Sequence, residues 1–153
     1  MRKALFATAA AVAMAFGTAQ AQQGDAAIGV SAGYPGLGVH ATVKDVSPAF
    51  DLRLNFGYAY AGDFSIGADV LYGIELGGSD LDADTYIGGG VGSTFGGDNN
   101  GFNAKVVVGA ETDLDALNLA QASVFFEAGP TYVFDGSTVG ADARIGINYT
   151  FPQ

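Results

Sequence analysis

Hydrophobic and polar residues alternate with a period of two along most of the chain from Ala26 onward. In the last such segment, residues 138–151, the alternation runs without an error. A period of two is the spacing of β-strands, in which successive side chains point to opposite faces. The apolar face of this segment carries Val139, Ala141, Ala143, Ile145, Ile147, Tyr149 and Phe151.

The same alternation recurs in seven earlier segments, which are separated by stretches rich in Gly, Pro, Asp and Asn. The predicted strands are residues 27–34, 37–44, 50–60, 64–76, 85–95, 102–112, 123–134 and 138–151. Segment 85–95 is the least regular, because its glycines blur the register. Pro130 cannot donate to a ladder and predicts a local bulge. Eight strands joined by hairpins predict an all-β, antiparallel, up-and-down barrel.

The first residues have the pattern of a cleavable signal peptide. Arg2 and Lys3 precede an apolar run over 4–16, and Ala19-Gln20-Ala21 is a small-x-small cleavage site. We predict a signal peptide over 1–21 and one barrel domain over 22–153. The alternative, an uncleaved anchor, is disfavoured because the run is short for a membrane span. No later segment offers about 20 consecutive apolar residues, the length of a transmembrane helix.

Alternation alone does not say which face lines the barrel. A soluble barrel of the lipocalin type would turn its apolar face inward, whereas a membrane barrel turns it outward. The polar face is rich in glycine, and an eight-stranded barrel has an interior only just wide enough for side chains. Small residues therefore suit the interior and bulky ones the exterior, which predicts a transmembrane barrel.

The placement of charge supports the same assignment. The formal net charge is −10, and it becomes −12 once the two basic residues of the predicted signal peptide are removed. All four remaining basic residues fall on the polar face together with six acids, as a paired interior requires. The predicted lumen charge network comprises Lys44, Asp51, Arg53, Asp69, Glu75, Lys105, Glu111, Glu127, Asp142 and Arg144.

Within this network, several pairings are open from the sequence. Arg53 and Arg144 could each pair with Asp51, Asp69, Glu127 or Asp142, and Lys105 could pair with Glu75 or Glu111. One interpretation is a plug of ion pairs that fills the lumen. The other is a narrow polar conduit with switchable pairs.

Aromatic residues gather toward the two ends of the predicted strands. Amphipathic rings at both ends are typical of the two interfaces of a membrane barrel. The predicted aromatic girdle comprises Tyr34, Phe50, Tyr58, Tyr60, Phe64, Tyr72, Tyr132, Phe134, Tyr149 and Phe151.

With its signal peptide, its alternating strands and its last strand ending in an aromatic residue, the chain resembles the small eight-stranded outer-membrane barrels. These are the OmpA transmembrane domain, the OmpX type and the opacity proteins. The resemblance implies a place in the cell outer membrane, contact with its lipids, and recognition of the last strand by the barrel-assembly machinery. Pro152 and Gln153 follow Phe151 and depart from that terminal pattern.

Little in the sequence points to catalysis or to a cofactor. The chain has no Cys, and its one His, His40, is interpreted as an interior polar group rather than a base or metal ligand. Asp80, Asp82 and Asp84 form a weak calcium candidate without the glycine and distal glutamate of an EF-hand loop. An acidic chain does not suit nucleic-acid binding. We predict that the protein is not an enzyme.

Three functions remain open. The first is a structural component of the outer membrane, in contact with other envelope proteins through a glycine-rich patch on segment 85–95. The second is a narrow, porin-like transport channel for small polar solutes. The third is a soluble, lipocalin-like ligand-binding barrel. The predicted exterior hairpins are short, which argues against an adhesin.

Overall fold

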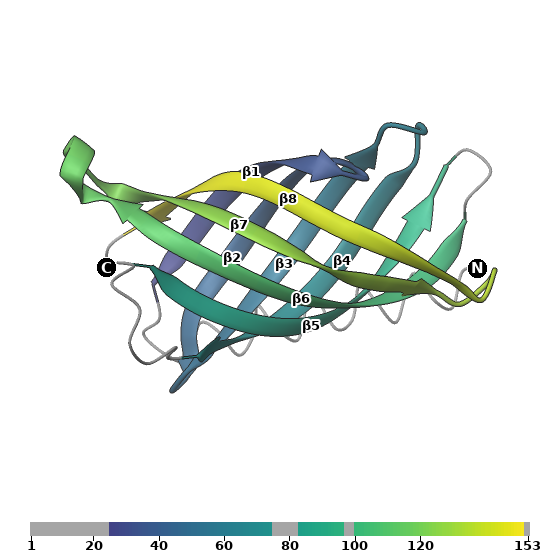
Figure 1. Ribbon diagram of the computed structural model, residues 1–153, viewed down its shortest axis with the longest axis horizontal. Coiled ribbons are helices and arrows are strands. Elements are labelled where there is room, and N and C mark those ends of the chain that lie inside the picture. Colours follow the sequence, from purple (N-terminus) through teal and green to yellow (C-terminus); the bar gives the residue numbers. More distant parts are fainter. Residues whose placement is uncertain (1–24, 75–82, 97–99, 152–153) are drawn as a thin grey trace.

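The protein forms a closed barrel of eight antiparallel strands in a computed structural model that describes residues 25–74, 83–96 and 100–151. Each strand pairs with the next along the chain, and β8 returns to pair with β1 (Figure 1). The predicted fold class is therefore confirmed, whereas the predicted signal peptide lies outside the described residues. The strands are β1 (Ala26–Tyr34), β2 (Gly36–Ser47), β3 (Phe50–Ala59), β4 (Phe64–Ile74), β5 (Asp84–Phe95), β6 (Gly101–Leu114), β7 (Leu119–Val133) and β8 (Thr138–Phe151).

The two ends of the barrel differ. Ala26 pairs with Phe151, so the first and last strands begin and end at the same rim, which we call the terminal end. The connections after β1, β3, β5 and β7 lie at the opposite rim, the hairpin end. At the terminal end, β6 and β7 extend past their neighbours and are joined by a single 3-10 turn, η1 (Asp115–Leu117) (Figure 1). No helix among the described residues has the length and apolar character needed to cross a bilayer.

The bulge predicted at Pro130 is wrong. Pro130 pairs with Ala141 of β8, and the β6–β7 register is the same on both sides of it, from Lys105↔Thr131 to Val108↔Ala128. The register shifts lie instead near the terminal end, between Val43 and Ser47 of β2 and between Asp113 and Leu114 of β6. The β6–β7 ladder has no residue pair at Pro130. No backbone hydrogen bond to β6 is therefore required from this proline, which has no N–H to donate.

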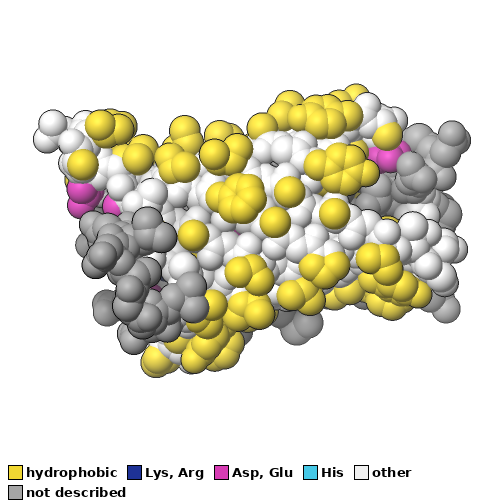
Figure 2. Space-filling view, in the orientation of Figure 1, with side chains coloured by type: hydrophobic (Ala, Val, Ile, Leu, Met, Phe, Trp, Pro, Cys, Tyr) yellow, Lys and Arg dark blue, Asp and Glu magenta, His cyan; other side chains and the backbone are white. Residues whose placement is uncertain are grey.

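The apolar face of every strand points away from the lumen. Phe126 is 57% exposed and Val139 is 70% exposed, although both are large apolar side chains. Figure 2 shows apolar side chains spread over the visible face between the two ends, with no Lys or Arg on its described part. Exposed apolar surface on this scale is unfavourable in water and suits a hydrocarbon solvent. The outer surface is thus that of a membrane-spanning barrel.

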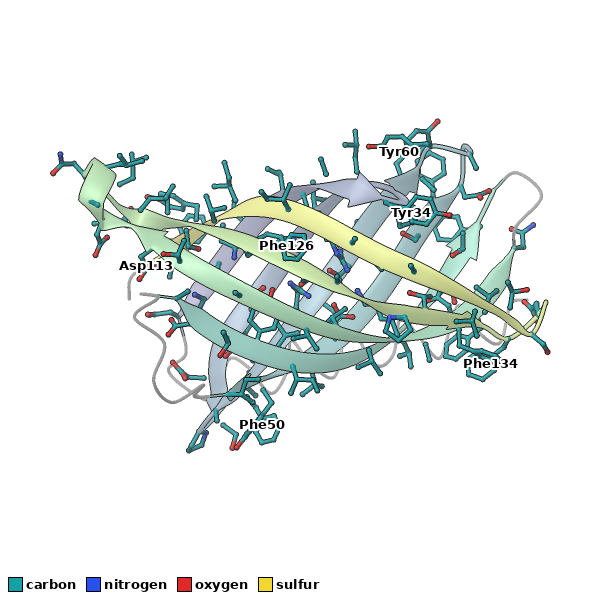
Figure 3. The ribbon with its side chains drawn as sticks, viewed as in Figure 1. Tyr34, Phe50, Tyr60, Asp113, Phe126 and Phe134 are labelled. Carbon is teal, nitrogen blue, oxygen red and sulfur yellow. The ribbon has the colours of Figure 1, made fainter. Side chains whose placement is uncertain are left out.

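The predicted girdle residues all lie on this outer surface. All ten are exposed, and Figure 3 labels four of them, Tyr34, Phe50, Tyr60 and Phe134. Several of the rings contact one another across neighbouring strands. Near the terminal end the Phe50 and Tyr72 rings lie 5.0 Å apart, and near the hairpin end those of Tyr58 and Phe64 lie 5.1 Å apart. Such cross-strand aromatic pairs stabilise the sheet at both rims.

Candidate functional site

The middle of the lumen is crossed by an arginine. Arg53 extends from β3 to β7, four strands away around an eight-stranded barrel, and its Nη2 donates to Glu127 Oε2 at 2.7 Å. Its neighbour on β4, Asp69, accepts from Arg53 Nε at 3.3 Å and from Nη2 at 3.2 Å. The Asp69 and Glu127 side chains are 0% exposed and that of Arg53 is 3% exposed. This buried ion pair therefore spans the lumen at mid-height.

Further donors surround the two buried carboxylates. Asn55 Nδ2 donates to Asp69 Oδ2 at 2.8 Å, and the Tyr86 hydroxyl donates to Glu127 Oε2 at 3.0 Å. Toward the hairpin end, Lys105 Nζ lies 3.0 Å from Asp69 Oδ2. The buried charges are thus paired, and each carboxylate accepts its hydrogen bonds through one oxygen, Asp69 Oδ2 and Glu127 Oε2, which offsets part of the cost of removing them from water.

Arg144 adds the last member of this central cluster. Its Nε lies 2.6 Å from Glu127 Oε1 and 3.3 Å from Asp142 Oδ1. Three cations, Arg53, Lys105 and Arg144, therefore face three carboxylates. The formal charge of the group is zero.

A second ion pair crosses the lumen nearer the terminal end. Lys44 Nζ on β2 lies 3.0 Å from Glu111 Oε1 on β6, again four strands apart. Glu111 also accepts from Ser123 Oγ at 2.6 Å and from Asn148 Nδ2 at 3.0 Å. His40 lies 2.7 Å from Asn148 through its Nε2 and is 5% exposed. The histidine is thus placed in a structural hydrogen-bond network.

Between the two ion-pair layers the lumen contains apolar side chains that the alternation did not indicate. Leu71, Tyr86 and Val107 form a buried cluster. Phe125 is 1% exposed and meets the His40 ring edge-on at 5.3 Å, while the guanidinium of Arg53 lies over it at 6.0 Å from the ring centre. The lumen is therefore filled partly by apolar packing, and it is not wholly polar as predicted. Leu71, Tyr86, Val107 and Phe125 all fall at lumen-facing positions of the alternating pattern, and this placement is the feature of the sequence that could have indicated apolar packing in the lumen.

Three details of the predicted charge network need correction. Lys105 pairs with Asp69 rather than with Glu111, because β5 has glycine at position 90, which lets the Asp69 carboxylate reach across to β6. Glu111 instead pairs with Lys44. Asp51 is half-buried and accepts the backbone N–H of Asp45 at 2.8 Å, outside the ion pairs. Glu75 lies outside the described residues.

The glycine-rich strand β5 also differs from its predicted role as an outer contact patch. Gly88, Gly90 and Gly92 face the lumen. Gly89 is the one glycine of this strand that faces outward. A Cβ at Gly88 would meet Leu71 Cδ2 at 2.6 Å. These glycines therefore make room for lumen side chains, and the predicted patch is wrong.

No cluster of three or more His, Cys, Asp or Glu side chains suited to a metal ion occurs among the residues that the structure describes. Asp80 and Asp82 of the calcium candidate lie outside those residues. Asp84 is exposed at the start of β5. The described geometry therefore adds no support to a calcium site.

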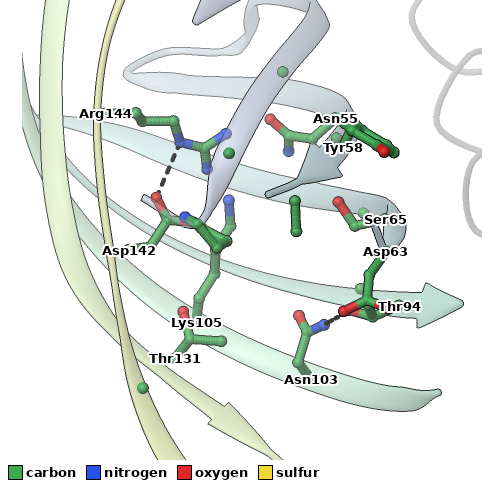
Figure 4. Close-up of a pocket in the computed structure, with 18 of the residues that line it drawn as sticks. Asn55, Tyr58, Asp63, Ser65, Thr94, Asn103, Lys105, Thr131, Asp142 and Arg144 are labelled. Carbon is green, nitrogen blue, oxygen red and sulfur yellow. Dashed lines mark hydrogen bonds and ion pairs between the residues drawn. The ribbon is translucent and has the colours of Figure 1, made fainter. Parts of the chain in front are cut away.

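A cavity of about 350 Å³ occupies the lumen between the central cluster and the hairpin end (Figure 4). It reaches the turn residues Pro35 and Asp63 at the rim, and Lys105, Asp142 and Arg144 line its inner part. The rest of the lining is mixed. Apolar residues such as Leu37, Val91 and Val133 contribute to it, and so do five amide or hydroxyl side chains: Asn55, Ser65, Thr94, Asn103 and Thr131. The cavity is thus a vestibule of mixed lining, with charged side chains at its inner end next to the central cluster.

No protein-family model matches the chain, and no curated protein matches it. Solved structures of small transmembrane barrels do. A designed transmembrane β-barrel has a TM-score of 0.62 at 16% identity, covering 85% of this chain and 98% of its own. A major outer membrane protein from Thermus thermophilus has a TM-score of 0.59 at 16% identity, covering 85% of this chain and 100% of its own.

The N-terminal β-barrel domain of Pseudomonas aeruginosa OprF has a TM-score of 0.56 at 12% identity, covering 83% of this chain and 96% of its own. Identities this low establish a shared fold alone. The chain therefore has the eight-stranded barrel fold of small outer-membrane proteins.

Proposed function

We propose that the protein is a non-enzymatic, integral barrel of the cell outer membrane, with a structural role in the envelope and a lumen closed to solutes. The observation that carries this proposal is the Arg53–Glu127 pair, which joins opposite walls of the barrel at 2.7 Å. An eight-stranded barrel is narrow enough for side chains to fill. One bridge across the middle, packed against Phe125, leaves no wide aqueous path.

The second ion pair, Lys44–Glu111, supports the same proposal, because it forms another bridge nearer the terminal end. A solute would have to break both bridges in turn. Breaking a buried pair leaves uncompensated charge and costs about 3–5 kcal/mol. Such a lumen suits a structural barrel better than a transport channel. We further propose that membrane lipids contact the apolar outer surface and that the barrel-assembly machinery inserts the chain through β8.

Planar-bilayer conductance of the refolded protein tests the proposal. We expect no steady channel events from the natural sequence. The double variant Arg53→Ser with Glu127→Ser removes the central bridge and should conduct, provided that heat-modifiable migration on a gel shows it to be folded. Thr131→Ala is the matched control, because Thr131 lines the lumen outside the ion pairs, and it should stay closed.

Steady conductance by the natural sequence would refute the closed lumen and favour the transport channel. A double variant that folds and stays closed would show that the central bridge is not what seals the barrel. Folding in plain buffer without detergent or lipid would favour the soluble, lipocalin-like barrel.

A further inference from the structure

The vestibule at the hairpin end has donors that the central cluster leaves unused. Arg144 uses Nε toward Glu127 and Asp142, and its two terminal amino groups form no hydrogen bond with any residue that the structure describes. Its side chain is 13% exposed and lines the vestibule (Figure 4). A guanidinium with two adjacent N–H groups available matches the two oxygens of a carboxylate.

The charges around the inner end of the vestibule favour an anion. Lys105 and Arg144 are 11% and 13% exposed on the vestibule side, whereas their partners Asp69 and Glu127 are 0% exposed beneath them. Asp142 is the one carboxylate of this cluster that lines the vestibule, and a second lining carboxylate, Asp63, lies at the rim. The inner end therefore presents two cations and one anion to the cavity, and a partly desolvated site strengthens their attraction for an added negative charge.

An acceptor faces the same space. Asn55 uses its amide nitrogen toward Asp69, and its Oδ1 is buried without a hydrogen-bond partner among the described residues. Asn55 lines the vestibule together with Thr131 and Asn103. A buried acceptor left unpaired is unfavourable, and a hydroxyl group on a ligand would satisfy it.

We propose that the vestibule binds a small hydroxylated carboxylate, held through its carboxylate by Arg144 and Lys105 and through a hydroxyl by Asn55. The volume of about 350 Å³ lies at the lower end of the roughly 300–1,000 Å³ range of small-molecule sites. The site lies on the hairpin side of the central bridge. The inference goes beyond the structural role and does not depend on it.

Titration of the refolded, isotope-labelled protein in detergent micelles tests the site by NMR. The probes are gluconate and lactate, which are hydroxylated carboxylates, and glucose, which has hydroxyls without a carboxylate. Gluconate or lactate should shift the side-chain signals of Arg144 and the amide signals of Thr131 in a saturable manner. Glucose should bind at least about tenfold more weakly, because it has no carboxylate for Arg144 and Lys105. A tenfold difference in affinity corresponds to about 1.4 kcal/mol.

Two glycine variants separate the site from general effects on folding. Gly140 lines the vestibule, and a Cβ there would meet no atom closer than Thr131 O at 3.8 Å, so Gly140→Leu can be accommodated at its Cβ and should fill part of the cavity. Gly73 also faces the lumen, nearer the terminal end, with nothing within 4 Å of a Cβ, so Gly73→Leu is the matched control. We expect Gly140→Leu to weaken binding by about tenfold or more and Gly73→Leu to leave it unchanged.

Arg144→Lys keeps the charge and removes the planar pair of donors, so it should weaken gluconate binding while the barrel still migrates as a heat-modifiable species. Absence of saturable shifts with both carboxylates would overturn the proposal. So would glucose binding as tightly as gluconate, or gluconate binding to Gly140→Leu as tightly as to the natural sequence. The conductance measurement reads a different property, so either proposal can fail alone.

Discussion

Gly90 on β5 is the position at which the smallest change in the sequence should disrupt the lumen most. It pairs directly with Asp69 of β4, and the Asp69 carboxylate passes over it to reach Lys105 on β6. A methyl group at this position would overlap Asp69 Oδ1 and come within 2.7 Å of the Ala68 carbonyl oxygen. Gly90→Ala must therefore displace the carboxylate or the strand.

The expected cost follows from what Asp69 holds. Its buried carboxylate lies 3.2 Å from Arg53 and 3.0 Å from Lys105, so a displaced carboxylate leaves two buried cations poorly paired. Loss of a buried pair costs about 3–5 kcal/mol, and overpacking alone costs about 1–3 kcal/mol. We expect Gly90→Ala to lower the free energy of unfolding by about 3–5 kcal/mol.

Gly89→Ala is the matched control on the same strand. Gly89 faces the membrane, and a Cβ there would meet no atom closer than Lys105 O at 3.8 Å. Glycine inside a strand is less stable than alanine by roughly 0.5–1 kcal/mol. Gly89→Ala should therefore leave the free energy of unfolding unchanged or raise it by up to about 1 kcal/mol.

Denaturant unfolding of both variants in lipid vesicles measures this difference. The chain has no Trp, so circular dichroism of the strands and heat-modifiable migration are the suitable signals. Equal stability of the two variants, or a loss in Gly90→Ala of less than about 1 kcal/mol, would refute the reasoning that Asp69 needs the space above Gly90.

Three other predictions concern the lumen and the outer surface and use the same unfolding measurement. Glu127→Gln leaves the two arginines that it pairs with short of a buried counter-charge and should cost about 3–5 kcal/mol; a neutral result would mean that water or another carboxylate replaces it. Phe126→Arg places a charge on the outer surface near mid-barrel and should cost about 2–4 kcal/mol, whereas Val139→Arg near the rim should cost about 0–1 kcal/mol, because the cost of a charge facing lipid depends on its depth. Equal costs would contradict a membrane between the rims. Gly146→Val should cost about 1–3 kcal/mol, because a Cβ there would overlap both the Phe125 ring and the Val30 carbonyl oxygen, and an unchanged stability would show that the ring and the neighbouring strand can both move aside.

The strands and the outer surface could be predicted from the sequence because alternation is a local property. In β8, each apolar residue of the alternating pattern faces outward, and the predicted bounds 138–151 match those observed. The same argument failed at Pro130, where a local rule predicted a bulge. The rest of the β6–β7 ladder holds the register there instead, so pairs on both sides override the preference of one residue.

The lumen was harder to predict because its contacts depend on how the sheet closes. Arg53 and Asp69 are register neighbours on adjacent strands. Their pairing follows from one hairpin, and Asp69 was among the partners that the sequence allowed for Arg53. Arg53 and Glu127 lie on opposite walls, so their contact depends on the heights of strands that share no hairpin. No pattern within a strand contains that information.

Gly90 explains why the ion-pair partner predicted for Lys105 was wrong, and why the central cluster needs glycine in strand β5. A side chain at Gly90 would separate Asp69 from Lys105, and the lysine would then have to seek an acid elsewhere, such as the Glu111 expected from its own strand. In a sequence, a glycine run weakens the signal for register, because it removes the alternation on which the register is read. In the barrel, the same run allows a carboxylate on β4 to pair with an ammonium on β6 across the intervening strand. The feature that made β5 the least predictable strand is therefore the one that allows the central cluster to form.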